Sequence, residues 1–357
     1  LVALGFLALY CFLRWPQQPP QCSLPSKFQP TLPPPLNFPQ AMPTPAPCLA
    51  NSSVPNISGF SQLPTHVQDF LLYQHCRSFP LLLDVPDKCG GAEGSSHTFL
   101  LLAIKSSPAN YNRREVIRKT WGQERTFRGA SIRRLFLVGV EGSDERREEK
   151  LNRLLKLEQK ERGDILQWHF KDTFFNLTLK QVLFHSWLLN NCPGVRFVFN
   201  GDDDVFANTD NLVRFAAGTG EGHLMVGHVI VNTGPIRAPY SKYYIPPALP
   251  APRRYPPYCG GGGMLMSGFT ARAIARQCQR LRLYPIDDVY LGLCLEREGL
   301  KPTPHFGIRT GGIRVPGKSR PLDPCYYREL LLVHGLLPYE VALVWDSIHD
   351  PQLRCGK

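Results

Sequence analysis

Continuous apolar runs alternate with segments of helical periodicity along the middle of the chain. Four runs have the length of buried strands, and each is bounded by polar or turn-forming residues. The runs cover 99–104, 135–140, 165–168 and 197–199, and the helical segments between them end near residues 121, 162 and 189. Asn176 is the predicted N-cap of the last of these helices. The alternation predicts right-handed βαβ units and an α/β fold with a mainly parallel central sheet and helices on both faces.

The first 13 residues form an uncharged, mostly apolar run that ends at Arg14 and Trp15. A membrane-spanning helix needs about 20 apolar residues, so segment 1–15 fits a truncated signal-anchor. The apolar core of a cleaved signal peptide is the alternative. Both interpretations direct the rest of the chain into the secretory pathway.

A proline-rich segment follows, with 12 of the 34 prolines of the chain between Trp15 and Cys48. Proline at this density favours extended polyproline II and makes a semi-rigid spacer. We therefore predict a luminal stem over 16–65, in which Cys22 is a candidate for pairing between chains. The compact domain is predicted over 66–357.

The composition favours a folded protein with anionic partners. Of the 357 residues, 43% are apolar, and 41 Lys and Arg against 29 Asp and Glu give a net charge of +12. The sequence has no zinc-finger spacing, RNP-like strand or dense basic tract, which argues against nucleic acid as the partner. Eleven cysteines without C-x-x-C spacing, eight of them from Cys76 onward, predict disulfides. Acceptor triplets for N-glycosylation begin at Asn51, Asn56 and Asn176.

Three consecutive carboxylates, Asp202, Asp203 and Asp204, follow the fourth apolar run. Ligands of parallel α/β sheets bind beyond the carboxyl ends of the strands. Residues i and i+2 of an extended chain share a face, so Asp202 and Asp204 are expected to point together. Clustered carboxylates repel one another unless a cation compensates, which suits Mg²⁺ or Mn²⁺ shared with substrate phosphates. The alternative is a hairpin turn at Asn200 and Gly201 with solvated acids.

A second acidic pair, Asp287 and Asp288, interrupts another apolar stretch. Either carboxylate is a candidate general base for an acceptor hydroxyl. Asp287 is also predicted to cap a helix that starts near Val289.

Two further segments are candidates for substrate contact. The glycines from Gly260 to Gly263 allow close backbone approach and positive φ, which suits a sugar or diphosphate against the main chain. A flexible loop is the alternative. Arg114 and Arg118 lie one helical turn apart and are candidates for phosphate contacts, with a solvated basic face as the alternative.

The segments that carry these residues are 113–121, 174–180, 201–206, 255–263 and 285–290. In this order, and from about residue 70 onward, the chain resembles the β-1,3-glycosyltransferase family. The four glycines and the Pro-Ile-Asp-Asp form are similar to its N-acetylglucosaminyltransferase branch. Asn200 departs from the family pattern, in which many members carry a lysine, so a phosphate contact by that lysine is lost.

The resemblance implies a GT-A-type Rossmann-like fold, a UDP-N-acetylglucosamine (UDP-GlcNAc) donor, a Mn²⁺ cofactor and inversion at the anomeric carbon. It implies catalysis by Asp288 as the base. The implied metal ligands are Asp204, His334 and Asp202. The implied donor contacts are Arg114, Arg118, Trp121, Asp202, Asp203, Gly261 and Gly262. The predicted acceptor contacts are Tyr258, Asp287 and Tyr244. Independently of the resemblance, Tyr243, Tyr244, Tyr255 and Tyr258 are candidates for stacking on sugar rings.

The implied reaction adds N-acetylglucosamine to the 3-hydroxyl of a terminal galactose on glycoproteins or glycolipids, in core-1 O-glycan extension or poly-N-acetyllactosamine synthesis. The implied location is the Golgi membrane, with a single-pass type II anchor and a luminal catalytic domain. The alternatives are a β-1,3-galactosyltransferase, a haloacid-dehalogenase-type phosphatase and a non-catalytic carbohydrate-binding module. The phosphatase family places its nucleophilic Asp after the domain's first strand, whereas three predicted strand–helix units precede the strand that leads into Asp202.

Overall fold

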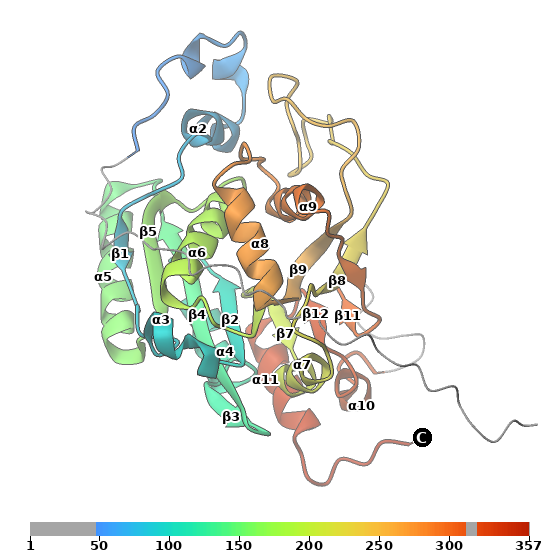
Figure 1. Ribbon diagram of the computed structural model, residues 1–357. Coiled ribbons are helices and arrows are strands. Elements are labelled where there is room, and N and C mark those ends of the chain that lie inside the picture. Colours follow the sequence, from blue (N-terminus) through green and yellow to red (C-terminus); the bar gives the residue numbers. More distant parts are fainter. Residues whose placement is uncertain (1–47, 312–319, 357) are drawn as a thin grey trace, which may run out of the picture. The chain divides into compact units, whose positions relative to one another are not determined.

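The computed structural model describes residues 48–311 and 320–356 (Figure 1). These residues belong to one compact unit, Thr44–Lys357. The predicted signal-anchor and most of the predicted stem lie outside the described residues. Within the described ranges, every helix is too short or too polar to cross a membrane.

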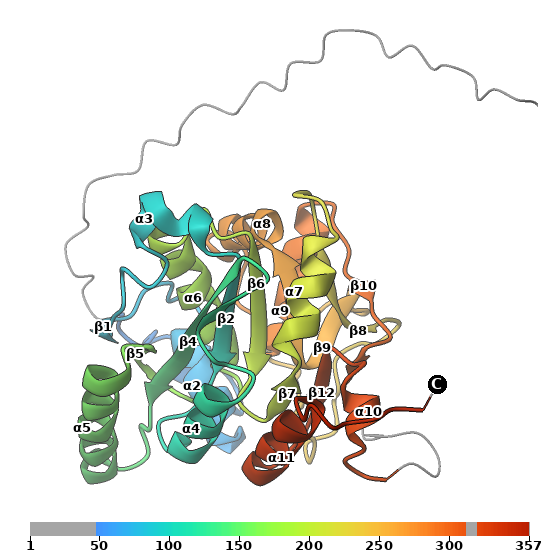
Figure 2. The ribbon, with the colours of Figure 1, turned by 90° about the horizontal axis from the view of Figure 1, so that it is seen from below.

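A nine-stranded sheet forms the centre of the unit, and helices cover both of its faces (Figures 1 and 2). Its strands are β1 (Leu81–Leu83), β2 (Leu100–Lys105), β3 (Arg125–Phe127), β4 (Ala130–Val140), β5 (Ile165–Lys171), β6 (Phe197–Asp202), β8 (Met225–Ile230), β9 (Tyr258–Ser267) and β10 (Thr303–Pro304). Their order is β1-β5-β4-β2-β6-β9-β8-β10, with β3 paired to β4. The centre, β5-β4-β2-β6, is parallel, while β1, β3 and β9 pair antiparallel with their neighbours.

A second, three-stranded sheet lies beside the carboxyl end of β6. It has the order β11-β12-β7 and consists of β7 (Val205–Ala207), β11 (Ile308–Arg309) and β12 (Leu332–His334). The helices are α2 (Thr65–Tyr73), α3 (Gly91–Gly94), α4 (Tyr111–Lys119), α5 (Glu145–Arg162), α6 (Leu177–Asn191), α7 (Thr209–Ala217), α8 (Gly268–Cys278), α9 (Asp287–Arg297), α10 (Pro324–Tyr327) and α11 (Pro338–Ile348).

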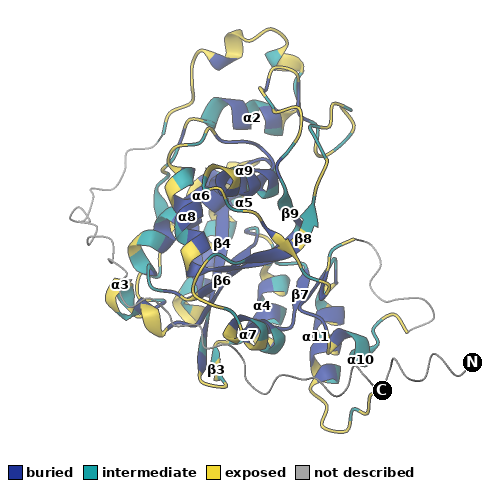
Figure 3. Ribbon diagram, turned by 45° about the vertical axis from the view of Figure 1, so that its right-hand side comes forward, coloured by how far each residue is buried: buried dark blue, intermediate teal, exposed yellow. Residues whose placement is uncertain are grey.

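The central strands are buried on both faces, which explains their unbroken apolar sequences. Along β2, Leu101 and Ala103 face the core under α2, α6, α8 and α9, whereas Leu100 and Leu102 face the core under α4, α5, α7 and α11. In Figure 3 the strands β4, β6 and β9 are accordingly almost entirely dark blue. The predicted α/β class, with a parallel centre and helices on both faces, is confirmed.

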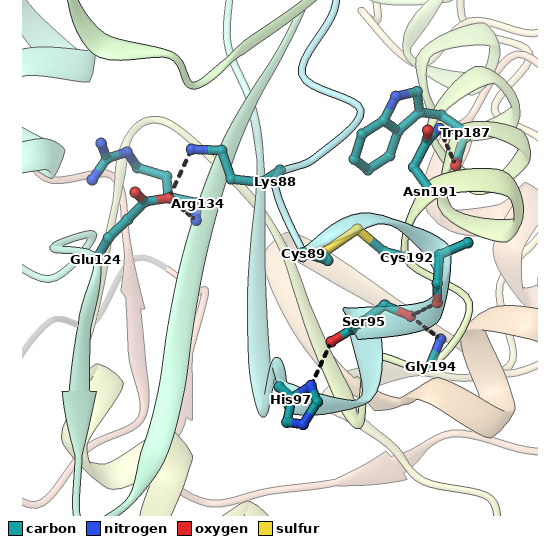
Figure 4. The surroundings of a disulfide bond; sticks show 12 residues. Lys88, Cys89, Ser95, His97, Glu124, Arg134, Trp187, Asn191, Cys192 and Gly194 are labelled. Atoms are coloured by element: carbon teal, nitrogen blue, oxygen red, sulfur yellow. Dashed lines mark hydrogen bonds and ion pairs between the residues drawn. A yellow bond between two sulfur atoms is a disulfide. The ribbon is translucent and has the colours of Figure 1, made fainter.

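Three disulfides join segments that are distant in the sequence: Cys48–Cys76, Cys89–Cys192 and Cys325–Cys355. Figure 4 shows Cys89–Cys192, which ties the segment before α3 to the end of α6, beside a hydrogen bond from the Gly194 amide to Ser95 Oγ. The prediction of disulfides holds for five of the eight cysteines from Cys76 onward, because the remaining three are buried free thiols. These are Cys259, Cys278 and Cys294.

Asn176 precedes α6 as predicted, but its side chain does not cap the helix. Its Nδ2 instead donates to Asp69 Oδ2 at 2.6 Å and to the Lys171 carbonyl at 2.9 Å. Asn176 is only 2% exposed, so a glycan on Nδ2 would have to replace both bonds, which contradicts the predicted attachment there. Asn51 and Asn56 are exposed, as an attachment site requires.

The carboxyl ends of β2 and β6 meet at the middle of the central sheet, where Lys105 and Asp202 are paired across the ladder. The chain leaves β2 toward α4 on one face and enters β6 from α6 on the other face. This change of face is the position where open α/β sheets bind ligands.

Candidate active site

The acidic triplet lies at the tip of β6, where Asp203 and Asp204 form a tight turn between β6 and β7. Asn200 and Gly201 are inside β6, so the hairpin-turn alternative for them is wrong. Asn200 is fully buried and exchanges two hydrogen bonds with Gln181 of α6, at 2.8 and 2.9 Å. Its side chain therefore faces the core.

Asp202 and Asp204 point toward His334, which ends β12. Their potential ligand atoms all lie within 4.8 Å of one another. The register of the small sheet causes this, because β12 pairs with β7 and sets His334 opposite Val205, one residue beyond the triplet. Two carboxylates and an imidazole are a donor set that suits Mn²⁺.

The charge balance around Asp204 also fits a cation. Its Oδ1 is buried and receives no hydrogen bond of good geometry, and His334 Nε2 lies 3.4 Å away. Burial alone would raise the pKa of Asp204, but His334 and Arg113 hold it below its usual value. The same contact raises the pKa of His334.

Asp203 points away from Asp202 and Asp204 and anchors the turn. It accepts hydrogen bonds from Ser106 Oγ at 2.7 Å and Asn110 Nδ2 at 2.9 Å, both in the connection from β2 to α4. Burial nevertheless raises the pKa of Asp203. Its carboxylate therefore holds the triplet against the neighbouring loop.

Lys105, which we did not identify from the sequence, links the two acidic segments. Its Nζ lies 3.0 Å from Asp202 Oδ1 and 2.8 Å from Asp287 Oδ2, and the lysine is 7% exposed. Its position directly after the first apolar run was the available signal, since strand ends in such sheets face the ligand.

Asp287 and Asp288 both lie in the first turn of α9. The helix begins at Asp287 and has no side-chain cap, so the predicted cap is wrong; the carboxylate binds Lys105 instead. Asp288 Oδ2 accepts a bond of 3.3 Å from the Gly261 amide. Burial, followed by the charges of Asp287 and Asp202, raises the pKa of Asp288 to about 8 despite Lys105. A general acid or base works best with a pKa near the operating pH, so this environment suits a group that exchanges a proton during the reaction.

The glycine run belongs to β9 and forms no flexible loop. Gly261 and Gly262 have φ of 82° and 90°, which favours glycine strongly. A Cβ on Gly262 would lie 2.5 Å from His334 Cδ2, and one on Gly261 would lie 2.5 Å from Thr310 Cβ. The glycines therefore make room for His334 and Thr310 of the chain itself, while their backbone also borders the site.

Two clefts meet at Asp288. The acidic cleft, of about 330 Å³, is lined by Lys105, Asp202, Asp204, Lys242, Asp288 and His334, among others. The tyrosine cleft, of about 470 Å³, is lined by Ile230, Ile236, Tyr243, Tyr255, Tyr258 and Val289, among others. The residues common to both are Tyr243, Gly261, Ile286 and Asp288.

Of the predicted acceptor contacts, Tyr258 lines the tyrosine cleft. Of the stacking candidates, Tyr243 lines both clefts and Tyr255 lines the tyrosine cleft, whereas Tyr244 lines neither. Asp287 borders the acidic cleft, but its carboxylate is buried against Lys105, so the predicted acceptor contact is not supported. Lys242 and Phe174 border the acidic cleft without having been predicted.

The predicted donor contacts Arg114, Arg118 and Trp121 lie outside both clefts. Arg114 binds Glu158 through two 2.8 Å bonds, and Arg118 binds Asp164 at 2.7 and 2.9 Å. Trp121 is fully buried. The helical spacing of the arginines was correct, but their face points to α5 and the sheet.

These arginines belong to a buried group that we call the arginine network: Arg114, Arg118, Arg134, Glu158 and Asp164. Arg114 also donates to Ser106 Oγ at 3.1 Å, and Ser106 in turn donates to Asp203. The network thus supports the acidic triplet through Ser106, although its members line neither cleft.

Comparison with known proteins identifies the family of the chain. The family described as galactosyltransferase matches residues 112–305. N-acetyllactosaminide β-1,3-N-acetylglucosaminyltransferase 3 from Homo sapiens is 53% identical, over 100% of this chain and 95% of that protein. The acetylgalactosaminyl-O-glycosyl-glycoprotein β-1,3-N-acetylglucosaminyltransferase from Homo sapiens is 49% identical, over 100% and 94%.

UDP-GlcNAc:βGal β-1,3-N-acetylglucosaminyltransferase 7 from Rattus norvegicus is 47% identical, over 87% of this chain and 77% of that protein. The resemblance inferred from the motifs is thereby confirmed. The chain belongs to the galactosyltransferase family, among relatives named β-1,3-N-acetylglucosaminyltransferases.

Proposed function

We propose that the protein is an inverting β-1,3-N-acetylglucosaminyltransferase that moves N-acetylglucosamine from UDP-GlcNAc to the 3-hydroxyl of a terminal galactose. The relative from Rattus norvegicus is named for this donor and for a β-galactose acceptor. The observation that carries the proposal is the position of Asp288, which lines both the acidic and the tyrosine cleft. A base between two substrate clefts can serve a direct displacement.

In this proposal the acidic cleft receives the nucleotide sugar and the tyrosine cleft receives the acceptor. Tyr255 and Tyr258 provide aromatic faces of the kind that pack against sugar rings. Asp288 accepts the proton of the attacking hydroxyl, and the Gly261 amide fixes its carboxylate. Attack opposite the departing UDP inverts the anomeric carbon in a single displacement.

Mn²⁺ is the proposed cofactor, with Asp202, Asp204 and His334 as its ligands. When bound, it would neutralise the charge that develops on the departing diphosphate. Lys105 holds Asp202 in place, and Asp203 fixes the turn that carries Asp204.

We also propose a Golgi membrane location with the catalytic domain in the lumen, anchored through segment 1–15. The three disulfides support an oxidising compartment. Extension of core-1 O-glycans and synthesis of poly-N-acetyllactosamine are the two acceptor settings proposed.

The test is a matrix of UDP-sugars and acceptors with and without Mn²⁺, with product linkage determined by NMR. Transfer from UDP-GlcNAc to galactose-terminated acceptors, lost on chelation, is expected. Transfer only from UDP-galactose would replace the proposal by the galactosyltransferase alternative. UDP binding without turnover would favour a carbohydrate-binding module, and phosphate release from a monoester would favour a phosphatase.

Substitution at the proposed metal site sharpens the test. Asp204→Asn should abolish both Mn²⁺ binding and transfer. Asp210→Asn is the matched control, because Asp210 lies on α7 and binds Arg125 and His349. Equal Mn²⁺ affinity in the two variants would contradict the assigned ligands.

A further inference from the structure

The long loop 231–257, which joins β8 to β9, is folded back on itself. Arg237 Nη1 donates to the carbonyls of Ile245 and Pro246 at 2.7 and 2.8 Å. The amide of Tyr255 donates to the Thr233 carbonyl at 2.8 Å and closes the loop near its ends. These bonds order the loop around Tyr243, which is many residues along the chain from β8 and β9.

Tyr243 is held against the segment that precedes α6. Its ring meets Phe174 edge to face, with the ring centroids 5.4 Å apart. Lys242 Nζ lies 4.8 Å from the centroid of Tyr243 and 5.5 Å from that of Phe174. Aromatic pairs and cation–π contacts of this geometry are attractive, so the cluster holds the loop over the acidic cleft.

Residues that line both clefts form the wall between them. Gly261 belongs to β9, and Ile286 and Asp288 belong to the start of α9. Tyr243 is the loop's contribution to this wall. Its ring therefore lies where the two clefts adjoin, together with Asp288.

We propose that Tyr243 is a positioning residue that keeps the donor and acceptor clefts apart, so that the base serves an acceptor hydroxyl rather than water. This inference rests on the proposed function. In transfer, the acceptor oxygen bonds to the anomeric carbon, the bond to the diphosphate oxygen breaks, and the hydroxyl proton passes to Asp288. In hydrolysis, water takes the place of the acceptor, and the products are free N-acetylglucosamine and UDP. Exclusion of water is what separates the two outcomes.

The experiment measures both reactions of the full chain with UDP-GlcNAc and a galactose-terminated acceptor. Transfer is followed as glycan product and hydrolysis as free N-acetylglucosamine. Tyr243→Ala should raise the ratio of hydrolysis to transfer about tenfold or more, because water enters and the acceptor is less well oriented. Tyr243→Phe should keep the wild-type ratio, because it retains the ring.

Tyr240→Ala is the matched control, since Tyr240 lies in the same loop and is 94% exposed. Phe174→Leu should give an intermediate ratio by loosening the contact that holds Tyr243. The ratio itself separates the inference from a structural role, because partial unfolding lowers both reactions together. If Tyr243→Ala does not fold, Tyr243→Leu replaces it in the same assay, once its melting temperature has been shown to equal that of the wild type.

An unchanged ratio in folded Tyr243→Ala or Tyr243→Leu, with normal transfer by the wild type, would overturn this inference and leave the proposed function standing. Absence of transfer by the wild type would overturn the proposed function and the inference together.

Discussion

Two groups of charged residues lie close together in this molecule and have opposite characters. In the arginine network, the carboxylates of Glu158 and Asp164 are each bound by two arginines, and Asp164 is fully buried. In the acidic cleft, five carboxylates at Asp202–Asp204, Asp287 and Asp288 face mainly Lys105, His334 and Arg113. Both groups are rich in charge, but the arginine network pairs two carboxylates with three arginines, whereas the carboxylates of the cleft outnumber the cations paired with them. An incomplete charge balance beside a cleft, rather than charge itself, indicates the functional site.

The largest expected effect comes from Asp288→Asn, which removes the proposed base from the acidic cleft. Transfer should fall by about 10²- to 10⁴-fold. UDP binding should stay near normal, and the melting temperature should not fall, because the substitution relieves repulsion with Asp287 and Asp202. Steady-state kinetics, calorimetry with UDP and thermal denaturation check the three parts. Wild-type turnover would exclude Asp288 as the base.

For Asp164→Asn in the arginine network, we expect the main effect to be on stability instead of on the chemical step. The substitution leaves Arg118 and Arg134 buried without their shared anion, which should cost about 3–5 kcal/mol of unfolding free energy. Because the two arginines hold the pKa of Asp164 low against its burial, the stability it contributes is present above the pKa of the unfolded chain. It is lost as the pH falls through the lower pKa of the folded state.

Urea denaturation of Asp164→Asn between pH 3 and 7 measures this loss. Glu161→Gln is the control, since Glu161 is exposed and forms a surface ion pair with Arg162. Its effect should stay within about 0.5 kcal/mol. Equal midpoints for the two variants would show that the network contributes no more than a surface pair.

Lys105→Met tests the boundary between the two groups, because Lys105 is buried like the arginines and yet borders the cleft. It should cost about 2 kcal/mol of stability by leaving Asp287 without its cation. It should also weaken Mn²⁺ binding, because Asp202 loses the contact that orients it. A loss of stability with unchanged Mn²⁺ affinity would assign Lys105 to structure alone. Lys88→Met, which breaks the more exposed pair with Glu124, is the matched control.

The smallest effect is expected at the half-exposed pair of His349 and Asp210, whose nearest atoms are 3.5 Å apart. The hydrogen bond to Asp210 raises the pKa of His349, so its stabilisation is complete below about pH 6.5 and disappears as the pH rises through the raised value. The melting temperature of the wild type should exceed that of His349→Gln at pH 6 and approach it at pH 8.5. Solvent exposure limits the difference to under about 1 kcal/mol.

The parallel centre of the fold could be predicted from the sequence, because strands that are buried on both faces have unbroken apolar sequences. It was insufficient for β8 and β9, which pair antiparallel on the other side of β6. There the glycine run interrupts the apolar pattern. Gly261 and Gly262 have positive φ, and their lack of a Cβ leaves room for Thr310 and His334, which come from distant parts of the chain.

Within the site, periodicity identified which residues share a face but not what that face contacts. It correctly paired Asp202 with Asp204 and turned Asp203 away. It failed for Arg114 and Arg118, whose common face is covered by α5 and the sheet. Tertiary packing decides between a ligand and a buried ion pair, and single-chain periodicity carries no information on that packing.

The pairing of β7 with β12 has a consequence for how the protein is made. Asp202 and Asp204 are synthesised well before His334, and the third side chain of the group joins them only when β12 has paired with β7. A chain whose translation stops before residue 334 would carry both carboxylates and all nine strands of the central sheet, but it would lack the imidazole. The proposed divalent-ion site is therefore complete only after β12 has been synthesised and has paired with β7.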